Sequence, residues 1–300
     1  MRYVFVVNPV AGKGEGEKLI RSMVDYYFSI HDGDVQIYVT ERHNHAKEIA
    51  QMEAQKGEPV RIFACGGDGT LNEVADGVYG YENVEISAIP CGTGNDFLKM
   101  FHHNINVFTN IEALINGSSK TIDLIRCNNQ YSINIASMGM DAEIAANMAR
   151  FKKLPVLGGK TAYTTALFYC LFKKTKNKFQ IIFEDGKKIE GNFLFALAAN
   201  GKWYGGGYKG APDAILDDGL LDLVLIKSVS IIKLLTLINT YKRGEHHKLK
   251  KIGIFLKAKR MEVISEHPAA LNRDGEITMV NRAVFEIVPS AIRFICPAVF

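Results

Sequence analysis

The sequence predicts two domains, an N-terminal α/β domain with a parallel sheet and a C-terminal antiparallel β domain. Apolar strands alternate with helical patterns up to about Ile125, and strands with hairpin signals dominate the remainder. A chain of 300 residues is long enough for two domains of ordinary size. The charge balance changes at the same point, with 10 Lys and Arg against 17 Asp and Glu up to Ile125, and 26 against 15 after it.

In the first domain, short runs of β-branched and aromatic residues predict strands, and apolar residues three and four apart predict helices. The predicted strands are 2–8, 35–39, 59–65 and 84–90, and the predicted helices are 18–30, 44–55 and 71–78. The side chain of Asn44 is expected to cap the second of these helices. Strands and helices in alternation give a parallel sheet with helices on both faces.

The second domain is predicted to consist mainly of strands. They lie at 131–137, 179–184, 190–198, 220–226, 251–256, 261–264 and 283–288, with helices at 141–149, 160–172 and 230–241. Asp185-Gly186 between two apolar runs is typical of a two-residue type I′ hairpin turn. The boundary near Ile125 has no linker rich in Pro or Gly, so it follows from the pattern alone.

The composition argues against several classes of protein. The N-terminus has neither the basic flank nor the cleavage site of a signal peptide. No run of about 18 uncharged apolar residues is present to span a bilayer. The five cysteines form no C-x-x-C pattern, which argues against a zinc site or a disulfide framework.

Three glycine-rich turns follow predicted strands of the first domain. Their sequences are N-P-V-A-G-K-G at 8–14, G-G-D-G-T-L-N-E at 66–73 and P-C-G-T-G-N-D-F at 90–97. The carboxyl ends of parallel strands meet at one edge of a sheet, where glycines let backbone N–H groups approach a phosphate. A single tight turn needs glycine anyway, but three turns at one edge predict nucleotide binding. The Walker A pattern G-x-x-x-x-G-K-[ST] is absent.

These motifs, with D-D-G-L-L-D at 217–222 and D-G-E at 274–276, resemble the diacylglycerol kinase catalytic domain family, in particular its soluble bacterial lipid kinases. The resemblance implies a Rossmann-like nucleotide-binding domain at 1–124, to which 289–300 returns, and a β-sandwich-like lipid domain at 125–288. It implies an enzyme that uses ATP and Mg²⁺ to phosphorylate a lipid hydroxyl. Diacylglycerol is the expected acceptor, and phosphatidic acid the expected product.

The same resemblance implies which residues form the site. The residues expected at the nucleotide are Asn8, Thr40, Gly66, Gly67, Asp68, Gly69, Thr70, Leu71, Asn72, Thr93 and Asn95. Those expected at Mg²⁺ are Asp68, Asp96 and Asp123 for the catalytic ion, and Asp218 with the backbone of Ile215 and Leu220 for a structural ion. Asp274 is expected to be the general base, with Glu276 close by.

The sequence leaves a second interpretation open for each acidic site. Asp274-Gly275 could be only a hairpin turn, and Asp96 could only cap the helix that follows. Asp123 could lie at the surface. The acidic residues of the 217–222 motif could be solvated loop residues, namely Asp217, Asp218 and Asp222.

The acceptor and the activity also have alternatives. A sphingoid base, phosphatidylglycerol or another lipid alcohol could replace diacylglycerol. An NAD-kinase-like enzyme is a further option, although the basic second half and the motifs at 217–222 and 274–276 argue against it. A non-catalytic regulator that binds nucleotide and lipid is the alternative from another class.

Basic clusters in the second domain predict its partner. They lie at 152–153, 173–178 and 242–251, where they would hold the protein at an anionic membrane surface without insertion. Helix 230–241 either lies in that interface or packs in the core. We therefore expect a cytoplasmic protein at the inner face of the membrane, with a lipid substrate and no nucleic acid as partner. A homodimer is left open.

Overall fold

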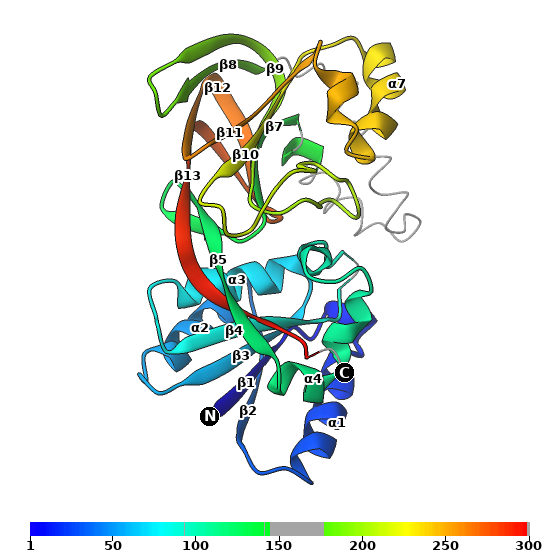
Figure 1. Ribbon diagram of the computed structural model, residues 1–300, viewed down its shortest axis with the longest axis vertical. Helices are drawn as coiled ribbons and strands as arrows, with labels where there is room; N and C mark the ends of the chain where they lie inside the picture. Colours follow the sequence, from blue (N-terminus) through cyan, green and yellow to red (C-terminus); the bar gives the residue numbers. More distant parts are fainter. Residues whose placement is uncertain (93, 141, 145–176, 299–300) are drawn as a thin grey trace. The chain divides into compact units, whose positions relative to one another are not determined.

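The computed structural model of the protein describes residues 1–92, 94–140, 142–144 and 177–298. The chain divides into two compact units (Figure 1). The first comprises Met1–Leu124, Leu216–Asp218 and Val288–Phe300, and the second comprises Ile125–Ile215 and Gly219–Ile287. The domain limits expected from the sequence, 1–124 with 289–300 and 125–288, omit the short return of Leu216–Asp218 to the first unit.

Parallel strands form the sheet of the first unit. In the described chain they are β1 (Arg2–Val7), β2 (Asp34–Val39), β3 (Val60–Gly66) and β4 (Val84–Pro90), in the order β4-β3-β1-β2. The register aligns Val7 with Val39 and Cys65, and Gly66 with Pro90. These strands therefore end at the same edge of the sheet, as the alternating pattern predicts.

Of the three helices predicted for the first unit, the first and third begin two and three residues earlier than the sequence indicates, and the second begins one residue later. The bounds are η1 (Ala11–Gly14), α1 (Gly16–Phe28), α2 (His45–Ala54), α3 (Asp68–Val78), η2 (Phe97–Met100), η3 (Ile105–Thr109) and α4 (Ile111–Ile115). The expected cap of α2 is wrong, because Asn44 is left-handed with a φ of 62° and its side chain makes no cap hydrogen bond. Glu73 Oε2 accepts instead from Ala46 N at 3.1 Å, so a neighbouring helix supplies the acceptor.

The last part of the chain lies in the sheet of the first unit. Strand β13 (Glu276–Cys296) is long, and its residues Arg293 and Phe294 pair in parallel with β4. Ser87 Oγ of β4 donates to the carbonyl oxygen of Ile295 at 3.0 Å. The buried Phe294 ring stacks on Phe101 at a centroid distance of 4.5 Å and meets the edge of Phe97 at 5.5 Å. This aromatic cluster fixes the C-terminal strand against β4.

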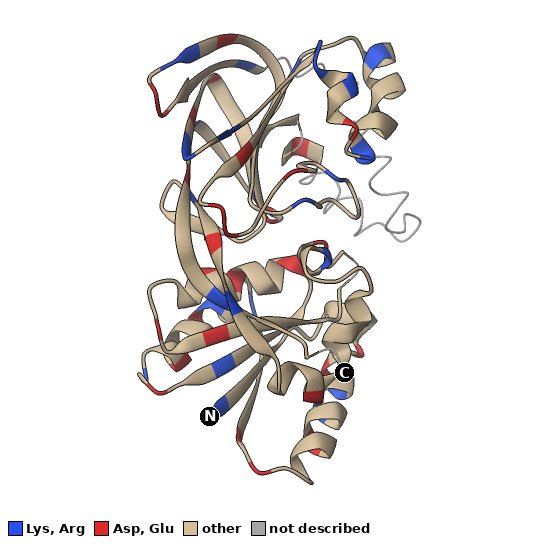
Figure 2. Cartoon of the chain, in the orientation of Figure 1, with Lys and Arg blue, Asp and Glu red and all other residues tan. Residues whose placement is uncertain are grey.

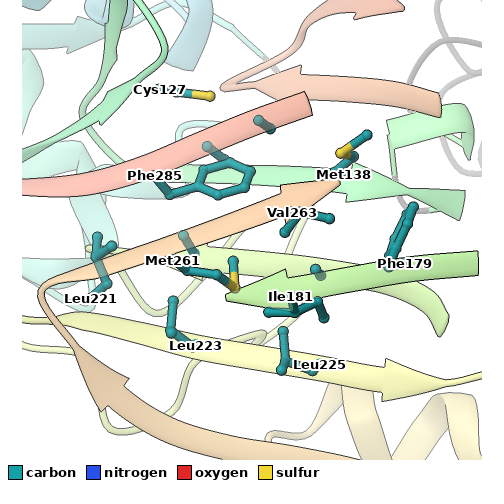
Figure 3. Packing of buried hydrophobic residues seen from close by; sticks show 14 of the residues in the cluster. Cys127, Met138, Phe179, Ile181, Leu221, Leu223, Leu225, Met261, Val263 and Phe285 are labelled. Carbon is teal, nitrogen blue, oxygen red and sulfur yellow. The ribbon is translucent and has the colours of Figure 1, made fainter. Parts of the chain in front are cut away.

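Antiparallel strands form the second unit, together with the first part of β13. They are β6 (Gln130–Ser132), β7 (Ile135–Gly139), β8 (Asn177–Phe183), β9 (Lys188–Ala199), β10 (Leu221–Lys227), β11 (Gly253–Ala258) and β12 (Arg260–Arg273), preceded by β5 (Ser118–Cys127). Strands β9 and β12 each pair with both β7 and β8, so these strands close on one another around an apolar core. Phe179, Met261 and Phe285 are buried there beside Leu223 (Figure 3).

The structure corrects three details predicted for the second unit. The run 131–137 divides into β6 and β7, with Ile133 and Asn134 between them. The turn at Asp185 has three residues rather than two, since Phe183 N donates to Lys187 O and only Gly186 has a positive φ. Strands β12 and β13 extend well beyond 261–264 and 283–288. The predicted helices 141–149 and 160–172 lie outside the described residues except at 142–144.

One long helix of the second unit, α7 (Ile231–Lys242), packs beside β9 and β10 (Figure 1). Ser230 Oγ caps it by accepting from Lys233 N at 3.4 Å, and the short helix η4 (His246–Leu249) follows it. The helix was expected at 230–241, and it lies there. Within the described ranges, every helix is too short or too polar to span a bilayer.

Candidate active site

The first glycine-rich turn is tied to the second through Asn8. Its backbone N–H donates to Cys65 O at 3.0 Å, which continues the sheet by one residue beyond β1. Its side-chain Nδ2 donates to Thr70 Oγ1 at 3.2 Å, and its Oδ1 accepts from Val10 N at 3.1 Å. Asn8 therefore holds the loop after β1 against the start of α3. Thr40, expected at the same edge, donates its N–H to Val7 O at 2.8 Å.

The second and third turns pack backbone against backbone. The carbonyl oxygen of Gly66 accepts from Cys91 N at 2.9 Å and from Gly92 N at 3.0 Å. A Cβ on Gly92 would lie 2.7 Å from Gly67 Cα, and a Cβ on Gly66 would lie 2.3 Å from Thr70 Oγ1. Both contacts are shorter than any side chain tolerates, so glycine is required at these positions by close approach.

Helix α3 begins at this edge without a side-chain cap. Its N-cap residue Gly67 is extended and has no side chain to accept from the first turn. The N–H groups of that turn and the positive end of the helix dipole favour an anion there. Leu71 was expected at the nucleotide, but its side chain is buried in the core and its N–H donates to Gly67 O at 3.2 Å. Thr93, also expected there, lies outside the described residues.

Asp68 connects α3 to the turn after β4. Its two carboxylate oxygens accept from Asp96 N at 3.0 Å and from Phe97 N at 3.1 Å. Burial raises the pKa of the Asp68 carboxyl, and the nearby Asp96 carboxylate raises the pKa further, against these hydrogen bonds. Two acidic side chains thus lie close together at the carboxyl edge of the sheet.

The environment of Asp96 tests whether this residue only caps the helix that follows it. Asp96 is buried and makes an ion pair with Lys99. It precedes η2, but its side chain forms no cap hydrogen bond there. The interpretation of Asp96 as only a helix cap is therefore wrong. In the turn before it, Asn95 adopts a φ of 50° and donates from Nδ2 to Gly92 O at 2.8 Å.

Asp123 lies in the interior of the first unit rather than at its surface. Only 2% of it is exposed, its Oδ1 accepts from Ser290 N at 2.8 Å, and its N–H donates to Leu216 O at 2.7 Å. Asp123 therefore holds both segments of the later chain that return to the first unit, at Leu216 and at Ser290. Among the described residues, Asp68, Asp96 and Asp123 do not bring three carboxylate oxygens within 4.8 Å of one another. Their role at a catalytic Mg²⁺ stays a prediction.

The residues predicted for a structural Mg²⁺ lie where the chain passes between the two units. Ile215 and Leu220 belong to the second unit, and Asp218 belongs to the first. Asp217 forms an ion pair with Lys120 at 3.0 Å. Asp222 is largely buried in β10 and pairs with Lys257 at 3.1 Å, so it is not a solvated loop acid. The structural metal site also stays a prediction.

Asp274 occupies a two-residue turn between β12 and β13. Arg273 pairs with Glu276 across it, and both central residues have positive φ, 45° for Asp274 and 104° for Gly275. This is the requirement of a type I′ turn, so the hairpin interpretation is correct. Glu276 lies 3.8 Å from Arg273 in a weak ion pair.

The Asp274 carboxylate does more than shape that turn. Its Oδ2 accepts from Ser132 Oγ at 2.6 Å and from Asn134 N at 3.0 Å, and its Oδ1 accepts from Ile135 N at 2.9 Å. Both oxygens are thus fixed in orientation by the segment between β6 and β7. The sequence analysis missed Ser132 and Asn134. Their signal is two polar residues inside the otherwise apolar run Y-S-I-N-I-A.

Comparisons with known proteins agree along the whole chain. The model of the diacylglycerol kinase catalytic domain matches residues 2–127, and that of the YegS C-terminal NAD kinase beta sandwich-like domain matches residues 134–296. A diacylglycerol kinase of Staphylococcus aureus is 31% identical over 274 residues, which cover 90% of this chain and 84% of that protein. A Shewanella frigidimarina protein named "Probable lipid kinase YegS-like" is 31% identical over 242 residues, 79% of this chain and 76% of that one.

The fold is shared with a solved structure as well. The crystal structure of a diacylglycerol kinase from Bacillus anthracis matches with a TM-score of 0.71 at 21% identity, covering 98% of this chain and 96% of that one. Two matching domain models, relatives above 30% identity and a common two-domain fold lead to one conclusion: this chain belongs to the diacylglycerol kinase catalytic domain family and is a lipid kinase.

Proposed function

We propose that the protein transfers the γ-phosphate of ATP, in the presence of Mg²⁺, to the hydroxyl of diacylglycerol. The observation that carries this proposal is that the fold provides both a binding position for a phosphate and a carboxylate held in a fixed orientation. The uncapped start of α3 offers donors to a phosphate, and Asp274 offers a carboxylate held at both oxygens. The names of the relatives add the lipid acceptor, since one of them is a diacylglycerol kinase.

The nucleotide phosphates would lie against the first turn of α3, at Gly66–Thr70. Backbone donors there cancel phosphate charge without side-chain rearrangement, which is what phosphoryl transfer needs. Asn8 braces this turn through Thr70, and the turn at Gly92 supports it from the other side. Thr40 lies just after β2 and Asn95 lies in the turn after β4, and both are proposed to contact the nucleotide as well.

The donor chemistry of this edge fits Mg²⁺. That ion prefers carboxylates, water and phosphate oxygens, and Asp68 and Asp96 provide two neighbouring carboxylates beside the proposed phosphate site. Burial, and after it the neighbouring Asp96 carboxylate, raises the pKa of Asp68. A cation would relieve the repulsion between the two carboxylates. When bound, the ion would neutralise the charge that develops on the transferred group. The family pattern adds Asp123 and, for a second ion, Asp218.

Asp274 would act as general base toward the acceptor. A lipid hydroxyl is a poor nucleophile, and a carboxylate within hydrogen-bond reach takes up its proton as the oxygen attacks the γ-phosphorus. A new oxygen–phosphorus bond forms, the bond to the bridging oxygen of ADP breaks, and the proton resides on Asp274. Ser132 and the N–H groups of Asn134 and Ile135 keep the carboxylate in one orientation throughout.

The second unit also carries features that suit a membrane surface. Helix α7 exposes 78% of Ile232 and 40% of Leu235 to solvent, and these two apolar side chains are neighbours on one face of the helix. Exposed lysines lie on this helix and after it (Figure 2), namely Lys233, Lys242, Lys250 and Lys251. Each basic residue near an anionic surface adds about 1 kcal/mol of attraction. We propose peripheral contact with the inner face of the membrane through this surface. The other predicted clusters, 152–153 and most of 173–178, lie outside the described residues.

One assay tests the proposed reaction. The protein is incubated with labelled ATP, Mg²⁺ and a panel of diacylglycerol, a sphingoid base, phosphatidylglycerol and NAD. We expect the label on diacylglycerol and its loss when Mg²⁺ is chelated. Transfer to another lipid would contradict diacylglycerol and identify that lipid as the acceptor. Transfer to NAD alone would refute lipid phosphorylation. ATP binding with no transfer would indicate a non-catalytic regulator.

A pair of variants tests the role of Asp274. Asp274→Asn should lower kcat by about 10²- to 10⁴-fold, as expected when a general base is lost. Asp185→Asn is the matched control, because Asp185 is an exposed turn residue of the same unit whose Oδ1 only accepts from Lys187 N. Equal kcat values for wild type and Asp274→Asn would remove Asp274 from the mechanism.

A further inference from the structure

One arginine of the second unit is buried next to the proposed base. Arg273 ends β12, directly before Asp274, and only 6% of it is exposed. Of the lysines and arginines whose burial the structure describes, it alone is buried. A buried charge is costly unless an opposite charge or a set of hydrogen bonds compensates it. The position of Arg273 therefore calls for an anionic partner.

The main chain at Arg273 is held from both sides. Arg273 pairs with Ala136 of β7 on one side and with Glu276 of β13 on the other. The turn that follows is braced as well, since Gly275 N donates to Asn272 Oδ1 at 2.8 Å. The side chain of Arg273 therefore starts from a fixed point, and the proposed base is the next residue of the same turn.

Within the described chain, no residue compensates the Arg273 guanidinium fully. Its ionic contact there is Glu276 at 3.8 Å, which is beyond hydrogen-bond reach. The Asp274 carboxylate bonds to the segment between β6 and β7 instead. The Cys127 thiol stays neutral, because burial raises its pKa to about 12 although Arg273 acts to lower it. The guanidinium thus has donors to offer to a ligand.

The burial of Arg273 lies mainly in its stem. None of its nitrogens is among the enclosed polar atoms that lack a partner in the described chain, so the guanidinium reaches solvent while the stem is covered. Arg273 and Glu276 are directly opposite in the hairpin, and side chains of such a pair lie on one face. A cation and a carboxylate thus wait at the turn that carries the proposed base.

The reaction proposed above brings an anion to this turn. When the acceptor oxygen at Asp274 takes up the phosphoryl group, the charge of that group is spread over its equatorial oxygens. A guanidinium can bond to two such oxygens with two parallel N–H groups. A cation that is already in position stabilises this charge without reorganisation at the moment of transfer.

We propose that Arg273 binds the phosphoryl group while the acceptor oxygen takes it up, and then the phosphate of the lipid product. This inference rests on the proposed function, because it adds a phosphate-binding residue to the same reaction. Arg273 exchanges its long contact with Glu276 for hydrogen bonds to phosphoryl oxygens, and it keeps its own proton throughout. The acceptor alcohol is neutral, so Arg273 favours the transition state and the product over the acceptor.

Steady-state kinetics of two variants tests the effect on the transition state. Arg273→Gln removes the charge and should lower kcat on dioctanoylglycerol by about 10²- to 10³-fold. The KM values for ATP and dioctanoylglycerol should stay within about threefold, which also shows that the variant folds. Arg273→Lys keeps the charge without the planar fork and should have an intermediate kcat. A wild-type kcat in Arg273→Gln would overturn the proposal.

The matched control is Arg282→Gln. Arg282 lies on β13 of the same unit, is exposed and forms an ion pair with Glu262 at 2.7 Å. Its replacement removes the same charge from the surface and should leave kcat unchanged. An equal fall of kcat in Arg282→Gln and Arg273→Gln would mean that only the net charge of the unit matters, and would contradict the proposal.

Calorimetry without ATP separates binding of the product from binding of the acceptor. Arg273→Gln should weaken dioctanoylphosphatidic acid by about tenfold or more and leave dioctanoylglycerol unchanged. Equal weakening of both ligands would indicate a structural role and refute the proposal. Dioctanoylphosphatidylglycerol carries its phosphate as a diester before any transfer. If Arg273→Gln weakened this lipid as much as the product, Arg273 would bind an anionic head group and not the transferred phosphoryl group.

The outcomes also distinguish failure of this inference from failure of the proposed reaction. Binding of dioctanoylphosphatidic acid that depends on Arg273, without phosphorylation of any lipid, would leave the phosphate site in place and refute the proposed function. Phosphorylation of diacylglycerol at the same kcat by wild type and Arg273→Gln would leave the function in place and refute the role of Arg273.

Discussion

Ser132 donates a 2.6 Å hydrogen bond to Asp274 Oδ2 although 142 residues separate the two in the sequence. Ser132 ends β6 and is fully buried, and its hydroxyl also lies 3.1 Å from the carbonyl oxygen of Ile135. A hydroxyl so placed can orient a carboxylate but cannot itself reach a substrate. Ser132 is therefore a positioning residue for the proposed general base.

Replacing Ser132 by alanine should lower kcat more than it changes KM. A hydrogen bond to a charged group is worth about 1.5–3 kcal/mol, which corresponds to about 10- to 100-fold in rate. Steady-state kinetics with diacylglycerol measures the effect. Ser119→Ala is the control. Ser119 lies on the exposed part of β5, and its hydroxyl donates to the Glu85 carboxylate of β4 at 2.7 Å. A Ser132→Ala enzyme with wild-type kcat would show that Asp274 needs no such support.

Gly92→Ala should weaken ATP binding by about tenfold or more. The new Cβ would lie 2.7 Å from Gly67 Cα, so the turn that carries Gly67 must move away from its position at the start of α3. Calorimetry with a non-hydrolysable ATP analogue checks the dissociation constant. Gly191→Ala provides a comparison, since a Cβ there would meet only the Phe193 side chain at 3.6 Å. Unchanged ATP affinity in Gly92→Ala would place the nucleotide elsewhere.

Phe294→Ala should lower the free energy of unfolding by about 3–5 kcal/mol, because it leaves a cavity among Phe97, Phe101 and Phe108. Urea denaturation followed by circular dichroism measures the change. Met279→Ala, on the same strand but at a position 61% exposed, should stay within about 0.5 kcal/mol of wild type. Similar losses in the two variants would mean that the end of β13 contributes little to the first unit.

His246 should make the second unit sensitive to acid. Its ring is buried against Tyr241 and Phe255, and neither ring nitrogen has a hydrogen-bond partner among the described residues. Burial lowers its pKa from 6.5 to about 4. The charged neighbours act in opposite senses, Asp213 raising the pKa and Lys209 lowering it. The unfolded chain takes up this proton near pH 6.5 and the folded chain only near pH 4, so stability should fall as the pH drops through that interval.

The substitution His246→Phe should remove this part of the pH dependence, because phenylalanine fits the same aromatic surroundings and does not titrate. Urea midpoints at pH 7, 6, 5 and 4.5 give the measurement. His247→Phe is the control, since His247 is exposed. If His246→Phe kept the wild-type slope between pH 6.5 and 4, another group would be responsible for it.

Local sequence patterns predicted the parts of the site that depend on local chemistry. The turns at Gly66 and Gly92 were recognisable because close backbone approach demands glycine, and the turn at Asp274 because an Asp-Gly pair tolerates two positive φ values. The parallel order of the first strands followed from their alternation with helices.

Contacts between distant segments could not be predicted in this way. The acceptor that replaces the Asn44 cap comes from Glu73 on another helix, and no local pattern reports it. The donors to Asp274 come from β6 and from the turn that follows it. Strand β13 was underestimated because its exposed residues between Glu276 and Arg282 are polar or lack the alternation that marks a strand.

The pairing of β4 with the end of β13 has a consequence for how the protein is made. Ser87 bonds to Ile295, 208 residues later, and Phe294 covers Phe97 and Phe108. During synthesis from the N-terminus, β4 emerges without this neighbour, and the rings of Phe97 and Phe108 that follow it in the chain lack the cover of Phe294. The first unit can therefore reach its final structure only after β13 has been synthesised, and until then β4 is an open edge at which newly made chains can associate.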